Sequence, residues 1–125
     1  MTNATKEIQA KSFDTTCTTK PIGDIARVDT VYLGEITANR AIMQPGFRWT
    51  EHIKPKAGTD LCQVRHTGYV VSGRIGIRMA DGTEGEVSEG YAFDVLPGHD
   101  MWVIGDEPYV SVDFSLTESP SVPLR

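Results

Sequence analysis

The sequence predicts an all-β fold, either a sandwich or a barrel. From about Val28 onward, turn-forming residues divide the chain into short segments at intervals of roughly ten residues, as in sandwiches and barrels. Within these segments apolar and polar residues alternate, which indicates half-buried strands. No window long enough for a stable helix shows apolar residues at three-and-four spacing, and the many Gly, Pro, Thr and Val residues disfavour one.

The clearest pair of strands flanks a short turn. In 74–79, Ile75, Ile77 and Met79 share one face, and the following Asp81-Gly82 is a strong hairpin signal. The same period of two continues in 47–54, 66–72, 91–96 and 109–116. We therefore expect a β-rich body built of hairpins.

The chain divides into three parts. Its 125 residues correspond to one domain. Residues 1–25 are polar and lack periodicity, so they are expected to form an arm that borrows its order from the body or from a second subunit. Residues 26–116 form the body, and 117–125, with two prolines, form a loose C-terminal tail.

Composition excludes several classes of partner. The net charge is −5 and no cluster of Lys and Arg is present, so nucleic acid is not expected. No apolar run approaches the roughly 20 residues of a membrane span, and the N-terminus lacks the apolar region of a signal peptide. A cytoplasmic protein with two free thiols, Cys17 and Cys62, is therefore expected.

The first half of the body resembles one motif of the cupin superfamily, which consists of a glycine, five residues, His-x-His, a short gap, Glu, six residues and a glycine. Gly46 and His52 match its start and Gly73 matches its end. Lys54 replaces the second histidine, and His66 occupies the position of the glutamate. The gap before His66 is several residues longer than is usual for the family.

The second half resembles the other cupin motif, in which a Pro-x-Gly turn is followed by two residues, a histidine, three residues and an asparagine. When Gly98 is aligned with the turn glycine, Met101 falls on the histidine and Gly105 on the asparagine. His99 is displaced by two residues, which keeps it on the same face of a strand. The resemblance covers residues 46–106, about half of the chain.

The resemblance implies a fold and a site. The fold is a single-domain jelly-roll barrel, the double-stranded β-helix of small RmlC-like cupins, with degenerate metal motifs. The site would bind a divalent transition metal (Zn, Fe, Ni or Mn) through His52, His66 and His99, and the family suggests a homodimer. A histidine at a strand end is also commonly a surface or capping residue, so both interpretations remain open.

Further residues are candidates for lining a ligand pocket. They are Arg48, Thr50, Lys54, Cys62, Met101 and Trp102. Each has a simpler interpretation, because charged side chains usually form a solvated face, and aromatic residues and a small buried cysteine usually fill the core.

Two functions follow as hypotheses. In the first, the protein is a metal-dependent oxygenase, isomerase or lyase that acts on a small polar metabolite, and Arg48 or Lys54 orients an anionic group. In the second, it is a ligand-binding or sensing module without metal or turnover. The metal content of the protein distinguishes the two.

Overall fold

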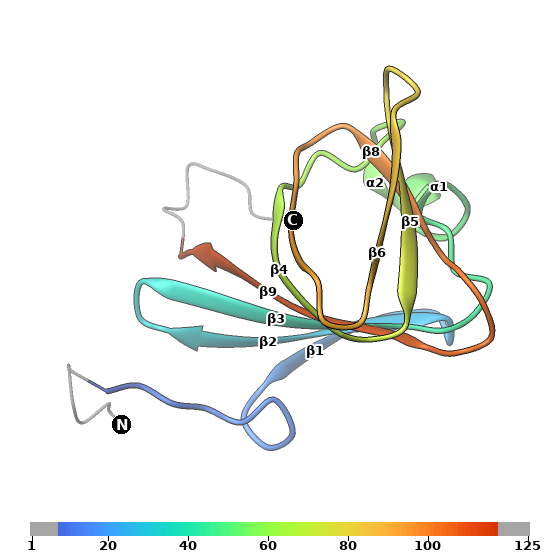
Figure 1. Ribbon diagram of the computed structural model, residues 1–125. Helices are drawn as coiled ribbons and strands as arrows, with labels where there is room; N and C mark the ends of the chain where they lie inside the picture. Colours follow the sequence, from blue (N-terminus) through green and yellow to red (C-terminus); the bar gives the residue numbers. More distant parts are fainter. Residues whose placement is uncertain (1–7, 118–125) are drawn as a thin grey trace.

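A computed structural model describes residues 8–117 as two antiparallel sheets with two one-turn helices at one end (Figure 1). The elements are β1 (Thr18–Ile22), β2 (Ala26–Leu33), β3 (Ile36–Met43), α1 (Trp49–His52), α2 (Lys54–Ala57), β4 (His66–Ser72), β5 (Arg74–Met79), β6 (Glu84–Ser88), β7 (Ala92–Val95), β8 (His99–Val103) and β9 (Tyr109–Leu116). The all-β prediction is confirmed. The helices, of four residues each, are too short to cross a membrane.

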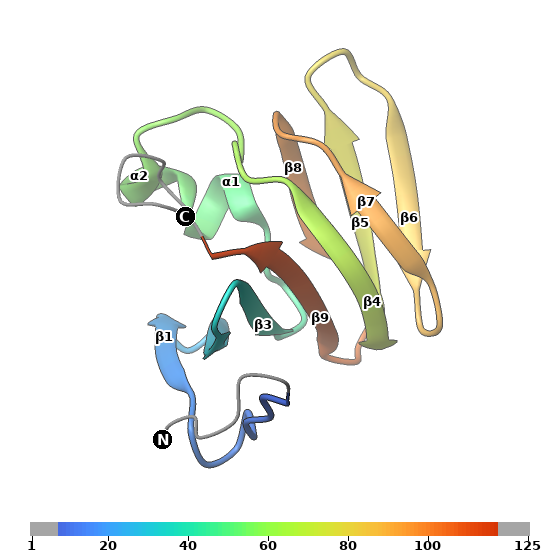
Figure 2. The same cartoon turned by 90° about the vertical axis from the view of Figure 1, so that its left-hand side faces the viewer.

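The larger sheet has six strands in the order β1-β2-β3-β9-β4-β7, and the smaller has three in the order β6-β5-β8. From β4 onward the chain passes repeatedly between the two sheets, which face each other in Figure 2. This is the jelly-roll arrangement that was expected. The predicted barrel is not closed, because the described strands form two separate hydrogen-bonded sheets.

The predicted hairpin is present. β5 pairs with β6 across the Asp81-Gly82 turn, where Gly82 has φ 92°, a conformation that favours glycine. Ile75 and Ile77 point into the space between the sheets, as their alternation predicts.

The last strand has its polar face inside the molecule. Tyr109, Ser111 and Asp113 of β9 are buried and line the interior, whereas Phe114 is half exposed on the outer face of the sheet. Period-two alternation identifies the two faces of a strand but does not say which of them is buried. The inward carboxylate brings a charged group into the molecule.

Residues 47–54 do not form the strand that their alternation predicts, because a carboxylate from β8 organises them differently. Asp100 accepts hydrogen bonds from the Thr50 amide (3.1 Å), the Thr50 hydroxyl (3.0 Å) and Arg48 Nη1 (2.8 Å). These bonds satisfy a backbone donor in the first turn of α1 that the helix itself leaves unpaired. Pro55 lies in the first turn of α2, a position that favours proline.

The N-terminal segment is ordered by the body. β1 lies within the predicted arm of residues 1–25 and pairs with β2. Preceding residues pack on the outer face of the larger sheet, where Arg40 binds Asp14 (3.0 Å) and Asp29 (2.8 Å) and stacks on the Phe13 ring. The predicted C-terminal tail lies outside the described residues except for Thr117.

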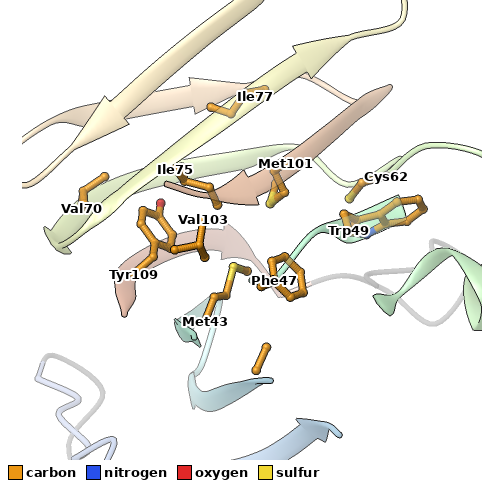
Figure 3. Close-up of a cluster of buried hydrophobic side chains, with 11 residues drawn as sticks. Met43, Phe47, Trp49, Cys62, Val70, Ile75, Ile77, Met101, Val103 and Tyr109 are labelled. Atoms are coloured by element: carbon orange, nitrogen blue, oxygen red, sulfur yellow. The ribbon is translucent and has the colours of Figure 1, made fainter. Parts of the chain in front are cut away.

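The core lies between the two sheets (Figure 3). It combines Ile75, Met101 and Val103 of the smaller sheet with Met43 and Tyr109 of the larger one. Cys17 and Cys62 are both free thiols, as predicted, and Cys62 belongs to this core.

Candidate metal centre

Three side chains that can bind a metal converge inside the molecule. Cys62, His66 and His99 each offer one ligand atom, and these atoms all lie within 4.8 Å of one another. His66 begins β4 and His99 begins β8, so the two histidines come from opposite sheets. Their rings meet edge to face, with centroids 5.3 Å apart.

Backbone hydrogen bonds attach Cys62 directly to the start of β8. The Cys62 amide donates to the His99 carbonyl (2.8 Å), and the Gly98 amide donates to the Cys62 carbonyl (2.7 Å). The backbones that carry the thiol and the His99 ring are therefore held side by side.

Both imidazoles direct Nε2 toward the cluster. His66 Nδ1 lies 3.1 Å from Asp113 Oδ2, and His99 Nδ1 lies 2.7 Å from the Leu96 carbonyl oxygen. An ionised carboxylate and a carbonyl only accept hydrogen bonds, so each Nδ1 carries the proton and, in the neutral ring, each Nε2 carries a lone pair. Such outer partners are typical of metal-binding histidines.

His99 Nε2 is a buried polar atom that has no hydrogen-bond partner within residues 8–117. Its side chain is fully buried, at 0% exposure. Burying an unpaired polar atom destabilises a protein, so such an atom in a native structure requires an explanation. A bound metal ion would provide one.

The thiol has the chemistry that a metal requires. Burial raises the pKa of Cys62, but the adjacent imidazoles, His66 first, lower it more, to about 6. Burial also opposes charge on His66, yet Asp113 and the Cys62 thiolate raise its pKa above the ordinary value. Cys62 Sγ lies 3.7 Å from His66 Nε2, close to the roughly 3.5 Å between ligands of a tetrahedral zinc site. The residues present therefore fit a metal ion.

A chain of hydrogen bonds leads away from His66 across the inner face of the larger sheet. Asn39 Nδ2 donates to Asp113 Oδ1 (3.1 Å), and Thr30 Oγ1 donates to Asn39 Oδ1 (2.6 Å). Thr30, Asn39 and Asp113 occupy facing positions on the adjacent strands β2, β3 and β9. The network holds the carboxylate that orients His66.

The cluster borders a cavity between the sheets. The cavity has a volume of about 880 Å³, and Cys62 and His66 are among its lining residues. Fully buried His99 is not one of the described residues that line it. A metal held by this cluster would be accessible to a small molecule from the cavity.

His52 lies apart from the cluster. It is on α1, its ring stacks on Phe47, and its Nε2 lies 3.4 Å from Glu51 Oε2. It lines the cavity, but the described metal-binding group contains only Cys62, His66 and His99. The structure thus brings together two of the three predicted histidines.

The other predicted pocket residues divide into two groups. Cys62 and Met101 line the cavity. The other four, Arg48, Thr50, Lys54 and Trp102, are not among the described lining residues. Arg48 pairs with Asp100 and stacks on Trp102. Thr50 binds Asp100, and Lys54 Nζ lies 3.5 Å from Asp60 Oδ1.

Sequence reasoning missed Asp113 and Asn39. The available signal for Asp113 was its place among the polar residues of the last strand, where it alternates with valines. Asn39 gave no comparable signal, because only strand pairing brings it to Asp113.

Comparisons with known proteins identify the fold. No family model and no curated protein matches the sequence. The structure resembles an RmlC-like cupin from Shewanella frigidimarina (TM-score 0.60, 16% identity, 91% of this chain and 96% of that one). It also resembles a protein of unknown function from Vibrio parahaemolyticus (TM-score 0.59, 12% identity, 79% of this chain and 97% of that one).

Oxalate decarboxylases are a further group of similar structures. The Bacillus subtilis enzyme has a TM-score of 0.56 at 19% identity, and the match covers 74% of this chain but only 26% of that one. Another structure of the Bacillus enzyme is described by its Mn(II) centres. At these identities the comparisons establish architecture, and the two facing sheets agree with it. The protein therefore has a jelly-roll fold like that of the cupin structures it resembles.

Proposed function

We propose that the protein is a metal-dependent cupin whose ion is bound by Cys62, His66 and His99. The observation that carries this proposal is the buried, unpartnered Nε2 of His99 beside a second imidazole Nε2 and a thiol. Both rings also have Nδ1 tied to acceptors outside the cluster, as is typical of metal-binding histidines.

The donor set favours some metals over others. Thiolate and imidazole ligands suit Zn, Fe and Ni, whereas Mn prefers carboxylate, carbonyl and water oxygens. Among the four metals expected from the sequence, Zn, Fe and Ni therefore fit better than Mn. When bound, such an ion would polarise a carbonyl or activate water or oxygen for an oxygenase, isomerase or lyase reaction on a small molecule.

Metal content tests the proposal. Protein purified without an affinity tag should contain close to one transition-metal ion per chain by elemental analysis. Cys62→Ala and His66→Ala should lose it, because each removes a ligand, whereas Cys17→Ala and His52→Ala should retain it. Circular dichroism checks that the variants fold. No bound ion after incubation with Zn, Ni, Mn and Fe(II) would refute the site and favour a ligand-binding module without metal.

A second function is supported by the alignment of Cys62, His66 and Asp113. The thiol lies 3.7 Å from one nitrogen of His66, and the carboxylate lies 3.1 Å from the other. Nucleophile, base and orienting acid follow this order in thiol-dependent enzymes. Rapid alkylation of Cys62 by iodoacetamide that added zinc does not slow would favour thiol chemistry over metal binding.

The proposal includes a homodimer, as the resemblance implies. The outer face of the larger sheet carries exposed apolar side chains on its adjacent strands β4 and β9, namely Tyr69, Val71 and Phe114. Exposed apolar groups gathered on one face are typical of interaction surfaces. A second copy of the chain would cover them.

A further inference from the structure

The cavity beside the cluster is large for a small polar metabolite. Its volume of about 880 Å³ lies in the upper part of the roughly 300–1,000 Å³ range of pockets that enclose drug-sized ligands. A two-carbon diacid would leave most of this space unfilled. The shape of the interior therefore points to a larger ligand.

Aliphatic side chains from both sheets form much of the cavity wall. Ile75, Ile77 and Val87 line it from the smaller sheet, and Val28 and Met43 line it from the larger one. Such walls gain free energy when they cover apolar atoms and offer no hydrogen bonds to a charged ligand. The body of the ligand should be apolar.

The lysines that line the cavity are confined to exposed positions. Lys20 and Lys56 are the lysines among the described lining residues, no arginine is included, and both lysines are exposed to solvent. Inside, the ionisable groups that the structure describes include the cluster and Asp113, which is bound to His66 and Asn39. Away from the cluster, a dianion would lose its hydration without a cationic side chain to replace it.

A line of polar groups crosses the interior, and Ser111 of β9 also lines the cavity. Thr30 and Asn39 line the cavity and belong to the hydrogen-bonded chain that ends at His66. Asn39 Nδ2 has two protons and donates one of them to Asp113. The Thr30 hydroxyl donates to Asn39, and its oxygen can still accept a hydrogen bond. A ligand with one oxygen-bearing group on its edge could form hydrogen bonds with these side chains.

We propose that the cavity takes a neutral aromatic or alicyclic compound that carries one hydroxyl or carbonyl group. Its ring body packs against the aliphatic walls, and its oxygen faces the cluster and the polar line. The inference rests on the proposed metal function for the role of the cluster, but the apolar walls recognise the ring body whether or not metal is bound.

Titration calorimetry with three apolar probes and oxalate tests this class of ligand. 2-Naphthol, 4-tert-butylphenol and 2-adamantanone are titrated into zinc-loaded and zinc-free protein. At least one probe should bind both forms with a negative heat-capacity change, because apolar surface is buried. Oxalate should bind zinc-free protein at least tenfold more weakly than that probe. Failure of all three probes, or tighter binding of oxalate than of the probes to zinc-free protein, would overturn the inference.

Two variants of matched size locate the binding. Ala41 lines the cavity, whereas Ala92 is exposed on β7. Ala41→Phe should weaken probe binding at least tenfold by filling the cavity, and Ala92→Phe should leave it unchanged. Binding that survives Ala41→Phe, in protein that circular dichroism shows to be folded, would place the ligand elsewhere and refute the assignment.

The metal content of the same samples separates the two proposals. Loss of probe affinity with zinc retained in Ala41→Phe supports the cavity assignment independently of the cluster. Probe binding by protein that never takes up zinc would support the apolar ligand and refute the metal function. Zinc binding by protein that binds none of the three apolar probes would support the metal function and refute the apolar ligand.

Discussion

At the scale of single residues, the central feature is Asp113, which links Asn39 on the inner face of the larger sheet to His66. Its carboxylate accepts from Asn39 on one side and lies 3.1 Å from His66 Nδ1 on the other. It fixes the proton on Nδ1 and leaves Nε2 for a metal. Asp113 is thus a positioning residue for the proposed centre.

Asp113→Asn should weaken zinc binding about 10–100-fold, the usual effect of losing an outer partner of a metal ligand. The amide no longer provides the charge that favours a basic imidazole. Zinc affinity by competition with a chelating dye measures the effect. Thr19→Val, which removes a hydroxyl bound to Asp29 on the outer face, serves as the control. Unchanged affinity in Asp113→Asn would show that the carboxylate does not orient His66.

Sequence reasoning found part of the site at this scale. The cupin resemblance predicts His52, His66 and His99 as ligands, and Cys62 is predicted only to line a pocket. His52 matches the start of the first motif, and alternation places it on the polar face of an expected strand. Its actual position depends on a carboxylate 48 residues away, at Asp100, and no local pattern reveals such a contact.

At the scale of elements, Asp100 holds α1 against β8. It is 6% exposed and receives bonds from Arg48, from both the amide and the hydroxyl of Thr50, and from the Met101 amide. The helical segment itself is a single turn, too short to be stable alone. Its position over the end of the cavity therefore depends on this carboxylate.

Asp100→Ala should lower the free energy of unfolding by about 2–3 kcal/mol, because it leaves buried donors unpaired. Urea denaturation measures the change. The matched control is Asp94→Ala, which breaks the exposed ion pair with Arg65 and should have little effect. Equal losses in the two variants would contradict a special role for Asp100.

The contact between the N-terminal segment and the sheet should respond to acid. Burial opposes ionisation of Asp29, but Arg40 and Thr19 lower its pKa below the ordinary 3.8. A carboxyl with a lowered folded-state pKa contributes stability that is complete above the unfolded value and is lost as pH falls through the folded one.

Between pH 5 and pH 2 the stability of the wild-type protein should therefore fall more steeply than that of Asp29→Asn. Chemical denaturation at a series of pH values gives both slopes. Parallel curves would mean that the Asp29–Arg40 pair contributes nothing to the acid response.

At the scale of the whole molecule, the fold follows from features that a sequence displays well. Period-two alternation and the Asp81-Gly82 turn predict the strands and a hairpin, and the resemblance of residues 46–106 to the cupin motifs implies the jelly roll. The open arrangement of the sheets and the inward polar face of β9 could not be predicted, because both depend on which strands pair across the chain.

The outer face of the larger sheet should mediate self-association. Phe114 and Val71 are 51% and 46% exposed there. The double variant Phe114→Ser, Val71→Ser should be monomeric by light scattering under conditions where the wild-type protein is a dimer, since apolar burial drives such contacts. Tyr32→Ser, which changes a residue 48% exposed on β2, is the control and should remain dimeric. A wild-type monomer at high concentration would refute the dimer.

The backbone bridge between Cys62 and His99 also bears on how an ion would be taken up. Main-chain hydrogen bonds already hold the backbones of two of the three ligands side by side, and the His99 ring is tied to the Leu96 carbonyl, so coordination would freeze few rotatable bonds and carry a small entropic penalty. The empty and loaded forms should then be nearly superimposable around residues 62 and 99. Uptake would be limited by the ion's own dehydration rather than by rearrangement of the protein.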